Sequence, residues 1–145
     1  SYGGYATLMG LVRHAELYRC GAAWAAVTDP RLMFEWTPIS DQRDEVRRHD
    51  YPYLIGDPVA DADRLTAVAP VAQAARIKAP VLLAMGALDR RVPLAHGTRM
   101  RVALREAGNA PEWVVYDDEG HGWLTLKNRV DFAQRLEAFM ARHLK

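Results

Sequence analysis

Three side chains in this sequence could together carry out acyl transfer: the hydroxyl of Ser1, the carboxylate of Asp89 and the imidazole of His121. A serine hydroxyl is a poor nucleophile until a base removes its proton. Histidine suits that task because its pKa lies near the usual operating pH. A buried carboxylate then fixes the tautomer of the ring and stabilises the imidazolium that forms. The three residue types together predict a hydrolase that works through an acyl-enzyme.

The first residues, Ser1-Tyr2-Gly3-Gly4-Tyr5, match the second half of a strand–nucleophile–helix turn, whose usual signature is G-x-S-x-G. Small residues are needed there because the backbone is strained and the helix passes close to the strand. In such a turn the backbone N–H of Tyr2 would be one donor to the oxyanion. We expect the strand before the serine, and the loop with the second donor, to precede Ser1.

The elements that must position these side chains follow from apolar patterning. Uninterrupted apolar runs predict buried strands, and apolar residues at helical spacing predict helices. The strands are 20–27, 80–86 and 113–116, and the helices are 3–14, 100–107 and 132–140. This alternation indicates an α/β fold with parallel strands and flanking helices. Asp89 and His121 each follow a strand, so they are predicted at the carboxyl edge of the sheet, where ligands and catalytic groups gather.

Between the first predicted strand and the second, residues 29 to 79 lack a regular pattern. Short helices are predicted over 41–50, which is densely charged, and over 61–68. The stretch carries too many large apolar residues for a free linker, so we expect it to lie as an excursion over the sheet.

Composition excludes several classes of function. The chain has 145 residues and a formal net charge of +1, which gives no electrostatic case for binding nucleic acid or an anionic membrane. No apolar run approaches the roughly 20 residues of a membrane span. The single cysteine, Cys20, excludes an internal disulfide and a cysteine-based metal cluster, and the histidines lack metal-ligand spacing. No metal and no cofactor are predicted.

The motifs around Ser1, Asp89 and His121 resemble those of the prolyl oligopeptidase family of serine peptidases (S9), which has the α/β-hydrolase fold. The nucleophile motif of that family, G-x-S-Y-G-G-Y, matches from Ser1 onward. Its acid loop resembles the segment from Gly86 to Pro93, and its histidine loop resembles Glu119-Gly120-His121-Gly122. The order serine, acid, histidine is also that of α/β-hydrolases.

The resemblance implies a peptide as substrate and the roles of nucleophile, acid and base for Ser1, Asp89 and His121. It also implies a pocket for the substrate side chain before the scissile bond, lined by Tyr2, Val27, Phe34, Trp36 and Val92. Plain core packing is an equal alternative for Phe34 and Trp36. For Arg91, pairing with a surface acid is favoured over facing the substrate.

The catalytic domain of that family is longer than this chain. We therefore expect residues 1–145 to form one partial α/β-hydrolase catalytic domain that is truncated at the nucleophile serine. Such a fragment is expected to be inactive alone and to expose a sheet edge. Self-association, or pairing with the missing N-terminal part of the same protein, would cover that edge.

Other interpretations remain open. A carboxylic-ester hydrolase of the same fold would use the same triad. An N-terminal nucleophile that uses its own amine as base needs stacked antiparallel sheets, which the pattern disfavours. A non-catalytic interaction fragment is the remaining class. Asp117 and Asp118 compete weakly for the role of the acid, but they lie close to His121 along the chain and follow the wrong strand.

Overall fold

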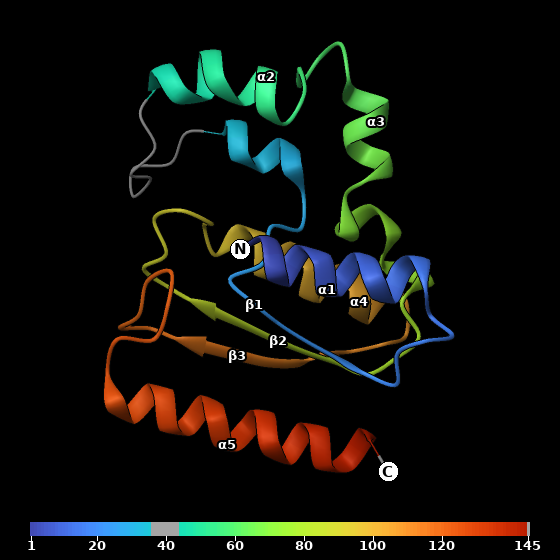
Figure 1. Ribbon diagram of the computed structural model, residues 1–145, viewed down its shortest axis with the longest axis vertical. Helices are drawn as coiled ribbons and strands as arrows, with labels where there is room; N and C mark the ends of the chain where they lie inside the picture. Colours follow the sequence, from blue (N-terminus) through green and yellow to red (C-terminus); the bar gives the residue numbers. More distant parts are fainter. Residues whose placement is uncertain (36–43, 145) are drawn as a thin grey trace.

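The computed structural model describes residues 1–35 and 44–144. Its strands form one parallel sheet with the order β1-β2-β3 (Figure 1). The strands are β1 (Gly21–Trp24), β2 (Val81–Gly86) and β3 (Glu112–Tyr116). β2 lies in the middle, with Ala84 aligned with Trp24 on one side and with Val114 on the other. Within the described residues, β1 and β3 are therefore the two edges of the sheet.

Helices cover both faces of the sheet, as an α/β fold requires (Figure 1). One face carries α1 (Tyr2–Arg13), the 3₁₀-helix η3 (Pro70–Arg76) and α4 (Ala95–Glu106). The opposite face carries α5 (Leu126–His143), the one helix on that face among the described residues. The predicted α/β class and its parallel strands are confirmed.

Alternate side chains of β2 serve the two layers of the core. Val81 and Leu83 pack among α1, η3 and α4, whereas Leu82 and Ala84 pack toward Phe132 of α5. Every residue of β2 is buried, which explains why the strand reads as an unbroken apolar run.

The excursion between β1 and β2 lies mostly beyond α1, on the side away from the sheet, and returns to the sheet at η3 (Figure 1). Its helices are the 3₁₀-helix η1 (Pro30–Phe34), the π-helix η2 (Val46–Asp50), α2 (Tyr51–Leu54) and α3 (Ala62–Ala67). The helix predicted over 61–68 is confirmed as α3. The helix predicted over 41–50 is helical from 44 onward, and 41–43 lie outside the described residues.

The strand predicted over 20–27 ends earlier than expected, at Trp24. Ala25 already has a positive φ of 47°, so the chain turns out of the sheet there. The turn lies against the start of α1, where a Cβ on Gly4 would come within 2.6 Å of the Ala26 Cβ and 2.9 Å of the Trp24 carbonyl oxygen. The second glycine after the serine is therefore needed for this close approach of helix and strand end.

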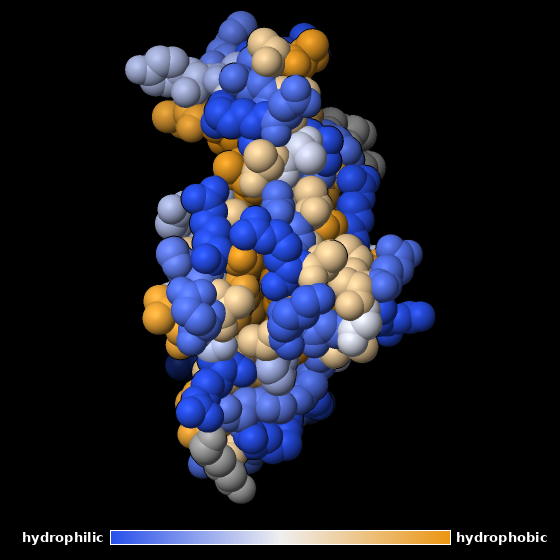
Figure 2. Space-filling model, turned by 90° about the vertical axis from the view of Figure 1, so that its right-hand side faces the viewer, coloured by the Kyte–Doolittle hydropathy of each residue, from blue (hydrophilic) through white to orange (hydrophobic). Residues whose placement is uncertain are grey.

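On the face shown in Figure 2, hydrophobic residues lie in small groups between hydrophilic ones. Single exposed apolar side chains are ordinary for a protein surface. No helix among the described residues has both the length and the apolar character needed to pass through a bilayer.

Candidate active site

The three candidate catalytic residues come from three different elements. Ser1 is the N-cap residue of α1, Asp89 follows β2 and His121 follows β3. Figure 1 shows the starts of α1 and α5 and the arrowheads of β2 and β3 toward the left-hand side, at the same end of the sheet. This end is the carboxyl edge of the parallel sheet, where the sequence predicts them.

Asp89 is fully buried and held on both carboxylate oxygens. Its Oδ1 accepts hydrogen bonds from the backbone N–H groups of Arg91 and Val92, each at 2.9 Å. Its Oδ2 lies 2.7 Å from Nδ1 of His121. Because an ionised carboxylate only accepts hydrogen bonds, this contact favours the tautomer of His121 with the proton on Nδ1. Nε2 is then left as the acceptor of that ring.

The loop after β2 that carries Asp89 (the acid loop) and the loop after β3 that carries His121 (the histidine loop) are joined through their backbones. The N–H of Ala87 donates to the carbonyl of Tyr116, and the N–H of Leu88 donates to the carbonyl of Glu119, both at 2.9 Å. This approach leaves no room for a side chain at Gly86, because a Cβ there would clash with the carbonyl oxygens of Glu119 and Gly120. The distance between Asp89 and His121 therefore depends on the absence of that one atom.

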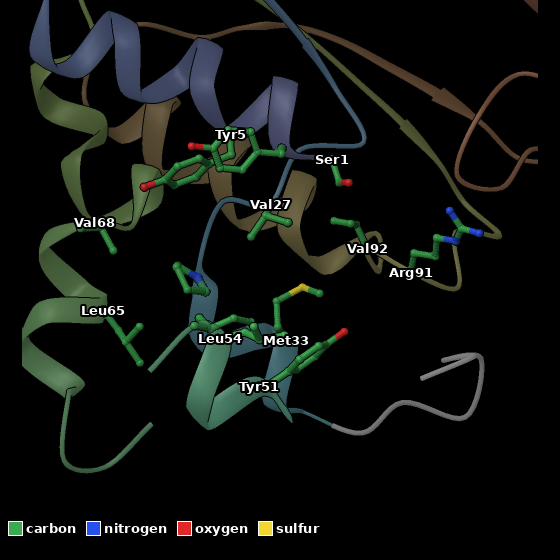
Figure 3. A pocket seen from close by; sticks show the side chains of 13 residues that line it. Ser1, Tyr5, Val27, Met33, Tyr51, Leu54, Leu65, Val68, Arg91 and Val92 are labelled. Atoms are coloured by element: carbon green, nitrogen blue, oxygen red, sulfur yellow. The ribbon is translucent and has the colours of Figure 1, made fainter. Parts of the chain in front are cut away.

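Ser1 lies at the edge of a pocket of about 540 Å³ between α1 and the excursion (Figure 3). The side chain of Ser1 makes no capping hydrogen bond and is exposed. Tyr2, 76% exposed, is the first residue of α1, so its backbone N–H has no partner within the helix. The pocket is lined by Ser1, Tyr2, Tyr5, Val27, Pro30, Met33, Tyr51, Leu54, Ile55, Leu65, Val68, Arg91 and Val92.

Three of the residues predicted to line a substrate pocket, Tyr2, Val27 and Val92, do line the pocket beside Ser1. Asp89 and His121 are not part of its lining. The pocket walls are mainly apolar and aromatic, the usual character of a small-molecule or side-chain site. Trp36 lies outside the described residues.

Phe34 does not line this pocket, which agrees with the alternative of packing and not with a place in the pocket wall. Its ring packs edge-on against Tyr51, with centroids 5.9 Å apart, and it borders a separate hollow that is also lined by Arg47 and Pro52. Successive side chains of a 3₁₀-helix point about 120° apart, so Met33 and Phe34 of η1 cannot both face the same side. Met33 takes the place that the sequence assigned to Phe34.

Arg91 also differs from the favoured expectation. It lines the pocket, and it forms no ion pair with any acid in residues 1–35 or 44–144. Figure 3 shows Arg91 at the rim of the pocket, with its guanidinium directed away from the apolar lining.

His96, to which the sequence assigns no role at the site, supports the pocket from within the core. The ring is fully buried in α4, and its Nδ1 accepts the backbone N–H of Thr28 at 3.1 Å. Burial lowers the pKa of His96 to about 4, so the ring is neutral and can act as this acceptor at neutral pH. The hydroxyl of Thr28 donates in return to the His96 carbonyl at 2.8 Å. These bonds fix the segment that carries Val27 into the pocket.

Among the described residues, no group of three or more histidine, cysteine or acidic side chains is arranged to hold a metal ion. The structure thus brings the imidazole of His121 and the carboxylate of Asp89 into direct contact, and it places the hydroxyl of Ser1 at the edge of the apolar pocket. In the part of the chain that the structure describes, no hydrogen bond joins Ser1 to His121.

Three parallel strands with flanking helices form part of an α/β-hydrolase fold, as the sequence predicts. An uncomplexed acylaminoacyl peptidase from Pyrococcus horikoshii has a similar structure, with a TM-score of 0.85 and 22% sequence identity. The likeness covers 99% of this chain and 23% of that chain.

The model of the prolyl oligopeptidase family matches residues 1–145, so the chain belongs to the prolyl oligopeptidase family. Dipeptidyl aminopeptidase BIII from Pseudoxanthomonas mexicana is 32% identical over 99% of this chain and 21% of its own length. Acylamino-acid-releasing enzyme 2 from Oryza sativa subsp. japonica is 30% identical over 83% of this chain and 16% of its own length. The chain thus spans about a fifth of the length of these two relatives.

Proposed function

We propose that this chain carries the nucleophile, the base and the acid of a serine peptidase. The hydroxyl of Ser1 attacks the carbonyl carbon of a peptide bond while Nε2 of His121 accepts its proton. The imidazolium then donates that proton to the leaving amine, and an acyl-enzyme on Ser1 remains. Water attacks the acyl-enzyme by the same route and releases the acid product. Asp89 orients the ring throughout.

The observation that carries this proposal is the 2.7 Å contact between Nδ1 of His121 and the fully buried carboxylate of Asp89. A histidine held by a carboxylate on one nitrogen is a general base on the other. Membership of the prolyl oligopeptidase family and the position of Ser1 at a helix N-terminus support the same assignment. A mechanism that uses the Ser1 amine as the base needs stacked antiparallel sheets, whereas the sheet among the described residues is parallel.

The oxyanion that forms on the substrate needs hydrogen-bond donors placed in advance. The backbone N–H of Tyr2 is the donor that we assign to this chain. Each such donor typically contributes about 10²–10³ in turnover. Since the chain spans about a fifth of its relatives, we propose turnover for the full-length protein and not for residues 1–145 alone.

The substrate that fits the site is an oligopeptide. Its side chain before the scissile bond would enter the apolar pocket and contact Tyr2, Val27 and Val92. Burial of an apolar side chain there contributes roughly 25 cal/mol per Å² of apolar surface. No cofactor takes part in this reaction scheme.

Covalent labelling tests the assignment directly. We expect a fluorophosphonate to label the full-length protein at Ser1, and His121→Ala to reduce the labelling rate by at least about 10³-fold, since the hydroxyl loses its base. His14→Ala, which changes an exposed histidine, is the matched control and should label at the normal rate. Labelling at another serine, or an unchanged rate in His121→Ala, would reject the proposal.

A comparison of substrates separates a peptidase from an esterase with the same triad. The full-length protein should cleave aminoacyl-p-nitroanilides as well as p-nitrophenyl esters. Hydrolysis of the esters alone would favour the esterase.

The edge of the sheet at β1 suggests how residues 1–145 associate. Trp24, 45% exposed, lies on this edge strand, whose outer backbone groups have no neighbouring strand among the described residues. We propose that the remainder of the same protein covers this edge, and that residues 1–145 alone self-associate. A monodisperse monomer by light scattering at micromolar concentration would contradict this.

A further inference from the structure

Glu119 is a buried acid that the reaction scheme above does not use. Its side chain is 1% exposed, and no ion pair to it exists within residues 1–35 and 44–144. Burial of a carboxylate is costly unless hydrogen bonds compensate it. A buried charge is thus a poor means of stabilising a fold, and its presence here calls for another reason.

The carboxylate of Glu119 accepts hydrogen bonds from the end of its own loop and the start of α5. Oε2 accepts the backbone N–H of Leu124 at 2.8 Å. Oε1 accepts the N–H of Thr125 at 3.0 Å, the hydroxyl of Thr125 at 2.8 Å and the side-chain amide of Asn128 at 2.8 Å. These bonds, the Leu124 N–H foremost, lower the pKa of Glu119 to about 2, so the group is ionised under all ordinary conditions.

The loop that these bonds close contains His121. That histidine lies between Gly120 and Gly122, and glycine leaves the backbone more freedom than any other residue. Thr125 is the N-cap residue of α5, so Glu119 ties the loop to the N-terminus of a helix, where negative charge is favourable. The glycine-flanked histidine segment is therefore closed into a loop by one side chain, which runs from Glu119 before His121 to Leu124 and Thr125 after it.

The backbone of Glu119 makes a second connection, toward the acid. Its carbonyl accepts the N–H of Leu88 at 2.9 Å, next to Asp89 in the sequence. One residue thus joins the acid loop, the histidine loop and α5.

We propose that Glu119 is a positioning residue that holds the imidazole of His121 against Asp89. This inference rests on the proposed function, because it acts only through His121 as the base. Removal of the carboxylate frees the glycine-flanked loop, and a misplacement of about 1 Å at a catalytic group costs roughly 10² in rate.

The test is a double-mutant cycle in the full-length protein, with an activated p-nitrophenyl ester as substrate. Glu119→Ala should lower kcat by about 10²-fold and change KM less than threefold, since the pocket is untouched. In a His121→Ala background the same substitution should change the residual rate less than threefold, because the residue through which it acts is absent. Glu137→Gln, an exposed acid of α5, is the control and should match the wild type.

A second variant guards against misfolding of Glu119→Ala. Glu119→Gln keeps the volume of the side chain but offers a single acceptor oxygen to the donors of Leu124, Thr125 and Asn128, and should also lower kcat at nearly constant KM.

Equal losses with and without His121, or a loss in KM alone, would overturn the proposal. If wild-type labelling at Ser1 fails, the proposed function itself is wrong. If labelling succeeds while both Glu119 variants turn over at the wild-type rate, only this inference is wrong.

Discussion

Asp89→Asn is expected to lower kcat of the full-length protein by about 10⁴-fold, with KM nearly unchanged. Oδ1 of Asp89 accepts two backbone N–H groups, from Arg91 and Val92, so the amide oxygen of asparagine would take that position. The amide NH₂ would then face Nδ1 of His121. Nδ1 must then act as the acceptor, so the ring proton moves to Nε2. A protonated Nε2 can no longer accept the proton of Ser1.

The measurement is steady-state kinetics on a peptide anilide, together with a thermal melt that shows whether the variant is folded. Asp117→Asn is the matched control, because Asp117 is an exposed acid near His121 that competed for the same role on sequence grounds. Its kcat should equal that of the wild type. A large loss in Asp117→Asn with little loss in Asp89→Asn would transfer the role of the acid and refute the site described here.

Gly86→Ala is expected to lower kcat by at least about 10²-fold and to destabilise the fold by about 1–3 kcal/mol. The added Cβ would meet the carbonyl oxygens of Glu119 and Gly120, which are backbone atoms and cannot rotate away. The histidine loop must then move off the acid loop, and the contact between Asp89 and His121 lengthens. Kinetics and denaturant unfolding measure the two effects.

Gly122→Ala provides the contrast within the same loop. A Cβ at Gly122 meets no heavy atom within 4 Å, so this variant should lose less than tenfold in kcat and little stability. Equal effects of the two substitutions would mean that loss of glycine freedom near His121 matters, and not the close approach at Gly86.

The elements that carry the site could be predicted because their patterns are local. The run from Val81 to Gly86 is apolar throughout since both faces of β2 are covered, and α1 shows its buried face at helical spacing. A residue that follows such a strand lies at the carboxyl edge of the sheet. The sequence therefore sufficed to propose Asp89 and His121 for one edge.

The lining of the pocket could be predicted only in part. Val27 and Val92 follow the ends of regular elements, and both line it. Met33 and Phe34 are neighbours in an irregular excursion, and no periodicity tells which of two adjacent apolar side chains points inward. The turn of η1 decided this, with Met33 in the pocket wall and Phe34 packed against Tyr51.

Taken by itself, the sequence determined the residue types, their order and the strand ends that they follow. Strand and helix periodicity and glycine-rich turns depend only on residues that are close together along the chain. Tertiary structure alone decided which groups meet. Asp89 and His121 are 32 residues apart, and His96 and Thr28 are 68 apart. Such contacts depend on how separate elements pack, and on spaces such as the one at Gly86, which no local pattern encodes.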